Sequence, residues 1–183
     1  MRFETVNNGD LITRIRERAR DPEQATDMKT CELYTANAPV APEQLVQAEA
    51  DLGFSLPEFL RKLYVSVGNG GFGPGYGLVA LRGTPPLYGF DLVGLYLKLV
   101  VHDPPPPPFH PWPKDFLMIT DWGCNITSLV NWRDGSVHRF NGDRHNDDSL
   151  PWESVMIPEA PTLEAWFEDW LVRTGRERFN AFR

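Results

Sequence analysis

The side chains that could do chemistry are few, and the clearest candidate is a cysteine–histidine pair. A thiolate nucleophile needs a nearby base, and Cys124 and His138 lie on neighbouring predicted strands. A free cysteine, however, is more often a buried and inert core residue. We therefore expect Cys124 to be a packed strand residue without a catalytic role. No serine lies in a GxSxG motif, so the sequence predicts no enzyme active site.

Metal-ligand spacing is equally absent from the sequence. None of the four histidines lies three or four residues from another, as a helical ligand pair would require. The densest group of potential ligands is in segment 142–149 and consists of Asp143, His145, Asp147 and Asp148. This segment lacks the glycine and the glutamate that a calcium-binding loop needs. We expect a solvated acidic loop there, and we predict no metal and no other cofactor.

A glycine-rich segment at 70–77, GGFGPGYG, could suggest a phosphate-binding loop. The Walker motif needs Gly-Lys-Ser/Thr, and a dinucleotide-binding motif needs a strand before its glycines and a helix after them. Here a predicted helix comes first, and a predicted strand at 78–81 follows. We interpret the segment as a connecting loop.

The charge of the chain favours a basic partner. Its 183 residues fall within the range of one domain, and its formal net charge is −7. Segment 39–172 holds 8 Lys/Arg against 17 Asp/Glu, whereas the last eleven residues hold 4 against 1. An acidic body repels phosphate backbones, so we expect no nucleic-acid binding. No apolar run suits a signal peptide or a membrane span, and we expect a cytoplasmic protein.

Helices that would carry these groups follow from hydrophobic spacing. The predicted segments are 11–20, 42–52, 59–67, 91–101 and 163–171. The arginines of the first helix are expected on a solvated face. Ser55 and Glu58 form a predicted capping box for the third. Thr162 and Gly175 are the expected cap and stop of the last, which we expect to dock on a sheet through Trp166.

Three strands are predicted between residues 116 and 141. They are FLMIT from Phe116, ITSLVNW from Ile126 and VHRFN from Val137, and Asp134-Gly135 is a hairpin turn between the last two. The proline run at 104–108 is expected to be a rigid surface connection.

Several motifs in this order resemble one family. They are EQLVQAEADLGFSLPEF at 43–59, NGG at 69–71, ITDWGCN at 119–125 and TLEAWFEDWL at 162–171. Together they are similar to the SUKH superfamily, whose bacterial members are mostly immunity proteins against polymorphic or contact-delivered toxins. Its fungal members regulate cell-wall synthesis. The resemblance implies a single α+β domain, with a mixed or antiparallel sheet flanked by helices, that binds a protein and needs no cofactor.

The family's signature residues map onto nine positions, which we expect to be caps, turns and core. They are Glu49, Gly53, Leu56, Pro57, Asn69, Gly70, Gly71, Trp122 and Gly123. The predicted organisation is an N-terminal extension at 1–38, the SUKH-like domain at 39–175 and a short basic tail at 176–183. The extension and the proline run depart from the family pattern.

Three classes of function stay open at this point. The first is an immunity protein that binds a basic toxin domain, the second is a regulatory scaffold, and the third is a small-ligand binder or an enzyme with an unrecognised pocket. Loops on a rigid scaffold often carry binding residues. We therefore predict that Asp143, Asp147 and Asp148 belong to the partner-binding surface.

Overall fold

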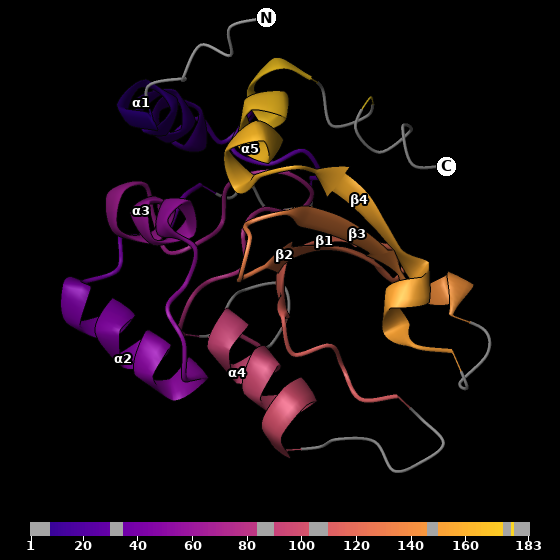
Figure 1. Ribbon diagram of the computed structural model, residues 1–183. Helices are drawn as coiled ribbons and strands as arrows, with labels where there is room; N and C mark the ends of the chain where they lie inside the picture. The colour runs from indigo at the N-terminus through magenta and orange to yellow at the C-terminus, as the bar shows by residue number, and fades with distance from the viewer. Residues whose placement is uncertain are drawn as a thin grey trace, which may run out of the picture.

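The computed structural model describes residues 8–29, 35–83, 90–102, 110–145 and 150–173, together with position 177. In these ranges five α-helices accompany a four-stranded sheet (Figure 1). The helices are α1 (Asn8–Ala19), α2 (Pro42–Leu52), α3 (Glu58–Ser66), α4 (Leu92–Tyr96) and α5 (Leu163–Val172). A π-helical segment, η1 (Leu97–His102), continues α4. The predicted α+β class is thereby confirmed.

The sheet is an antiparallel meander in the order β1-β2-β3-β4. Its strands are β1 (Phe116–Gly123), β2 (Ile126–Asn131), β3 (Val137–Asn141) and β4 (Met156–Ala160). The three predicted strands and the Asp134-Gly135 hairpin are confirmed, whereas β4 was not predicted. Two 3-10 turns, η2 (Gly142–Arg144) and η3 (Trp152–Val155), connect β3 to β4.

Both faces of the sheet are covered by apolar side chains. The larger core contains Leu117, Ile119 and Val130 from the sheet together with buried residues of all five helices. A second cluster on the other face contains Trp112, Leu129 and Phe140. In Figure 1, α1, α3 and α5 gather beside the sheet, while α4 lies apart from them. Trp166 is 1% exposed, as expected for the side chain that docks α5.

Both ends of α2 and the start of α5 have the predicted terminal residues, whereas the start of α3 does not. Pro42 begins α2, Gly53 ends it in the left-handed conformation, and the Thr162 hydroxyl accepts from Ala165 N at the start of α5. The predicted capping box of Ser55 and Glu58 is wrong, because Pro57 is the N-cap residue of α3. A proline fixes φ near the helical value and needs no amide partner in the first turn.

Helix α1 is part of the common core. Leu11, Ile15 and Ala19 are fully buried against α3 and α5. The arginines of α1 were expected on a solvated face. This holds for Arg14 and Arg20, which are exposed. Arg16 and Arg18 are partly buried and contact neighbouring elements.

Two arginines of α1 tie it to other helices. Arg16 Nε donates to Ser66 O at the end of α3, over 2.9 Å. The Arg18 guanidinium lies 4.4 Å from the centre of the Trp170 ring in α5 and pairs with the buried Asp27 at 3.9 Å. Burial lowers the pKa of Arg18, and Asp27 opposes that shift. The stem of a long arginine can cover apolar surface while its head stays bonded, which explains why these two are not solvated.

The edge of β1 is covered by irregular chain. Tyr76 N donates to Asp121 O and Val79 N to Ile119 O, both over 2.9 Å. The predicted strand at 78–81 is therefore wrong as a strand, although it runs along β1, because it forms no continuous ladder. The Tyr64 hydroxyl donates to Val79 O at 2.8 Å, and burial raises the pKa of Tyr64.

Candidate protein-binding surface

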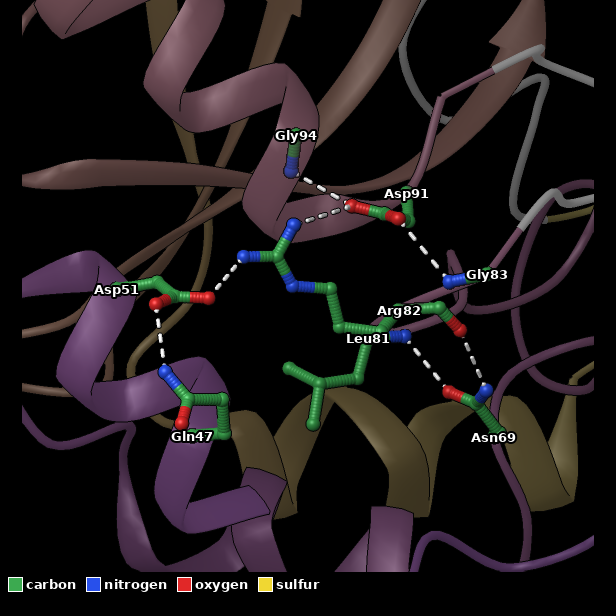
Figure 2. A network of polar contacts seen from close by, with 8 residues as sticks. All are labelled: Gln47, Asp51, Asn69, Leu81, Arg82, Gly83, Asp91 and Gly94. Atoms are coloured by element: carbon green, nitrogen blue, oxygen red, sulfur yellow. Dashed lines mark hydrogen bonds and ion pairs between the residues drawn. The ribbon is translucent and has the colours of Figure 1, made fainter. Parts of the chain in front are cut away.

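The side chain of the signature residue Asn69 forms hydrogen bonds with the backbone of residues 81 and 82. Its side-chain oxygen accepts from Leu81 N at 2.7 Å, and its amide donates to Arg82 O at 2.8 Å (Figure 2). One side chain thus satisfies two backbone groups of the loop that follows the glycine-rich segment. Asn69 lies inside the fold as a structural residue.

Arg82 extends this network to two helices. Its guanidinium bonds the Asp51 carboxylate in α2 and lies 3.9 Å from Asp91, the cap of α4 (Figure 2). Asp91 in turn accepts from Gly94 N and from Gly83 N. The arrangement fixes α2, the 81–83 loop and α4 relative to one another.

Two more signature positions hold the start of α3. Glu49 accepts from Leu56 N at 2.7 Å and forms an ion pair with Arg61 at 3.1 Å. Gly53 has φ +80, which favours glycine. The motif at 43–59 therefore joins α2 to α3 through these contacts.

A pair of glycine variants tests whether Gly70 packs closely against the backbone of residues 78–80. A Cβ at Gly70 would lie 2.5 Å from Leu78 O at φ +76, whereas a Cβ at Gly53 would meet nothing within 4 Å. Gly70→Ala is expected to lower the free energy of unfolding by about 2–5 kcal/mol through strain and overlap. Gly53→Ala should cost only about 1–2 kcal/mol. Urea denaturation measures both, and equal losses would contradict the close approach at Gly70.

Trp122 belongs to a buried polar network that links four strands and α5. Its indole N–H donates to the Ser128 hydroxyl at 2.8 Å, and Ser128 donates to Glu159. Glu159 also pairs with the Arg139 guanidinium and accepts from the Trp166 indole at 2.8 Å. The side chains of Arg139 and Glu159 are only 4% and 3% exposed. Sequence analysis did not single out this ion pair.

The predicted partner-binding loop is only partly described. Asp143 lies in η2, is exposed, and accepts from the Asn125 amide at 3.2 Å. Asp147 and Asp148 lie outside the described residues. His145 stacks on Trp152 with ring centres 4.1 Å apart. The described part of this loop is therefore anchored to the sheet, with the Asp143 carboxylate at the surface.

The expectation that Cys124 is packed in the core is wrong. Cys124 is exposed and, with Asn125, has positive φ in the turn between β1 and β2. Two such residues form the type of two-residue turn that matches strand twist. His138 lies on β3 with its ring 3.1 Å from the Ser136 hydroxyl, and burial lowers its pKa while Asp134 opposes the shift. The two side chains have no contact with each other in the structure as described.

A groove forms where three chain segments converge, and we call it the hairpin groove. It has a volume of about 350 Å³ and is lined by residues 57–59 at the start of α3, 132–135 in the β2–β3 hairpin and 162–164 at the start of α5. Phe59 and Leu163, which are 3% and 1% exposed, contribute its apolar part. Sequence analysis missed this groove because its segments are far apart in the chain.

The rim of the hairpin groove carries three carboxylates, Glu58, Asp134 and Glu164. Asp134 accepts from both the backbone N–H and the hydroxyl of Ser136, and these hydrogen bonds lower the pKa of Asp134. Lys62 lowers the pKa of Glu58 through a hydrogen bond of 2.6 Å. The rim is negatively charged at neutral pH.

The described residues do not meet the requirements of a metal site or of a membrane-spanning helix. Among the described residues, no three His, Cys, Asp or Glu side chains are grouped so that they could hold a metal ion. No helix within the described ranges combines the length and apolar character of a membrane span. The proline run at 104–108 and the basic tail at 176–183 fall almost wholly outside these ranges, so those expectations stay predictions.

The fold and this surface define a single α+β domain with an open antiparallel sheet and an acid-rimmed groove. The chain matches the SMI1 / KNR4 family (SUKH-1) over residues 39–169. It belongs to that family, and the predicted SUKH resemblance is confirmed. The family supports a general protein-binding role, of the immunity or cell-wall-regulator type. No curated protein matches the chain.

Proposed function

We propose that this chain is a cytoplasmic immunity protein that neutralises a polymorphic or contact-delivered bacterial toxin by binding it. The observation that carries the proposal is the family match over residues 39–169. The signature residues that the structure places serve as caps, turns and members of structural networks, so we assign them to the scaffold. Partner choice would then depend on surface residues outside the pattern.

The charge of the molecule supports a basic partner. The formal net charge is −7, and the described surface presents carboxylates at Asp143 and around the hairpin groove. Complementary charge speeds the encounter of two proteins and disfavours wrong partners. In this proposal the protein acts by occupying the toxin and catalyses no reaction.

The direct test searches the neighbouring reading frame for a secreted chain with a basic, toxin-like C-terminal domain and uses that domain in a catalytically inactive form. Calorimetry is expected to give one-to-one binding with a Kd of about 10⁻⁷ M or tighter. Absence of binding at micromolar concentrations would contradict the proposal. Binding to a wall-synthesis enzyme in its place would favour the regulatory scaffold.

The acidic loop gives a kinetic prediction. Replacing Asp143, Asp147 and Asp148 together by asparagine is expected to lower the association rate with this toxin domain roughly 3–10-fold at low salt. The difference should shrink at high salt, since salt screens exposed charges. Stopped-flow mixing at two ionic strengths measures it.

A matched variant controls for net charge. Asp10→Asn, Glu17→Gln and Glu23→Gln together remove three exposed carboxylates on and after α1. This control should leave the rate within about two-fold, if the loop and not the total charge steers the encounter. An equal rate for the loop variant and the wild type at both salts would remove the loop from the interface.

A further inference from the structure

We propose that the hairpin groove binds a lysine or arginine side chain of the protein partner and so acts as an anchor of the complex. The inference rests on the proposed binding function and adds the place and chemistry of the contact. The groove offers an apolar wall and an acidic rim in one cavity of about 350 Å³. That volume is within the range of ligand pockets, about 300–1,000 Å³.

The apolar part of the groove suits the stem of a long cation. Pro57 and Trp132, which are partly exposed, supply the accessible apolar wall, whereas Phe59 and Leu163 are almost fully buried. Lysine and arginine bury their methylene chains on such surfaces while the charged head reaches a polar rim. A short polar or acidic side chain would leave this wall uncovered.

Two carboxylates of the rim have no ion-pair partner among the described residues. Asp134 and Glu164 form no ion pair in the described part of the chain. The two cations nearby are already engaged, because Arg133 bonds Asp115 at 2.8 Å and Lys62 bonds Glu58 at 2.6 Å. A cation entering the groove would therefore meet two carboxylates from different elements, the hairpin and α5.

Helix stabilisation alone does not explain this arrangement. Glu58 and Glu164 lie in the first turns of α3 and α5, where negative charge stabilises a helix N-terminus. Asp134 belongs to the hairpin and gives no such benefit to either helix, yet it borders the same groove. Three carboxylates around one groove disfavour an anionic ligand and favour a cationic side chain.

The groove and the acidic loop lie at opposite ends of β3. The hairpin precedes Val137, and η2 with Asp143 follows Asn141. Five residues of strand separate them by roughly 15 Å, a span that one ordinary interface covers. We assign the steering of the encounter to the loop and the holding of the partner to the groove.

The test compares two double variants that remove the same charge. Asp134→Asn with Glu164→Gln is expected to weaken binding of the neighbouring-encoded toxin domain at least 10-fold, mainly through faster dissociation. The control is Asp21→Asn with Glu43→Gln. Asp21 accepts from Glu23 N two residues on, as Asp134 does from Ser136 N, and Glu43 lies in the first turn of α2. The control should bind within about two-fold of the wild type.

A second measurement separates the groove from the proposed function. Gly-Arg-Gly amide is titrated into the ¹⁵N-labelled protein, with Gly-Gln-Gly amide as the neutral comparison. The arginine peptide is expected to shift the amide signals of Gly135 and Leu163, and the groove variant should lose these shifts.

The outcomes distinguish the two claims. If the wild type binds the toxin domain and the groove variant binds it equally well, the groove proposal is overturned and the immunity function stands. If no toxin domain binds but the arginine peptide still shifts Gly135 and Leu163, the groove stands and the immunity function fails. Equal shifts with both peptides would overturn the groove as a cation site. Equal melting temperatures of the variants confirm that folding is not the cause.

Discussion

Replacing Glu159 by alanine is expected to lower the free energy of unfolding by about 3–5 kcal/mol. The substitution would leave the Arg139 guanidinium, whose side chain is 4% exposed, without its carboxylate. It would also remove the acceptor of the Trp166 and Ser128 hydrogen bonds. An unpaired buried charge destabilises the folded state by more free energy than the intact ion pair contributes to its stability.

Chemical denaturation with a matched set of variants measures this effect. Glu153→Ala in the exposed turn before β4 should change stability by less than about 0.5 kcal/mol. Arg139→Met combined with Glu159→Leu should recover part of the loss, because both charges are then absent. A loss below about 1 kcal/mol for Glu159→Ala would show that water reaches the pair and that the network does not hold β4 in place.

Replacing Ile15 by alanine is the second change with a large expected effect, about 2–5 kcal/mol. Ile15 is fully buried in the main core although it lies outside the segment that matches the family. The variant leaves a cavity between α1 and the helices α3 and α5. We therefore expect α1 to unfold together with the family domain as one cooperative unit.

Thermal and urea unfolding check this prediction. Arg14→Ala on the exposed side of α1 is the control and should stay within about 0.5 kcal/mol of the wild type. The wild type should unfold in one transition by circular dichroism and by tryptophan fluorescence. Two separate transitions, or an Ile15→Ala variant as stable as the control, would show that α1 docks weakly.

Much of the fold could be predicted because its elements carry strong local signals. Helices α2 and α5 show apolar residues at helical spacing with proline, threonine or glycine at their ends. The hairpin between β2 and β3 contains Asp-Gly, a strong turn signal. These signals extend over only a few residues, so they can be recognised without knowledge of the tertiary structure.

Strand β4 could not be predicted, since its sequence argues against a strand. MIPEA contains Pro158 and Glu159, and proline is rare inside sheets except at edges. The strand lies at the edge, and the buried Glu159 is satisfied there by Arg139 from β3, Ser128 from β2 and Trp166 from α5. No local pattern reveals a pairing between side chains twenty residues apart.

The position of Cys124 was mispredicted for a similar reason. Two-residue turns of this type usually contain glycine, whereas here the residues with positive φ are Cys124 and Asn125. Neither turn residue is a glycine, so the sequence did not indicate that Cys124 lies at the surface in a tight hairpin turn. The hairpin groove was equally invisible, because residues near 58, 134 and 164 come together only in the folded chain.

Neutralisation in cells tests the central claim most directly. The toxin domain found by the search of the neighbouring reading frame is expressed in active form under a regulated promoter, with or without this protein. Wild-type protein is expected to restore growth fully, and the Asp134→Asn/Glu164→Gln variant only in part at equal expression. Growth arrest that persists with the folded wild-type protein present would contradict the immunity function.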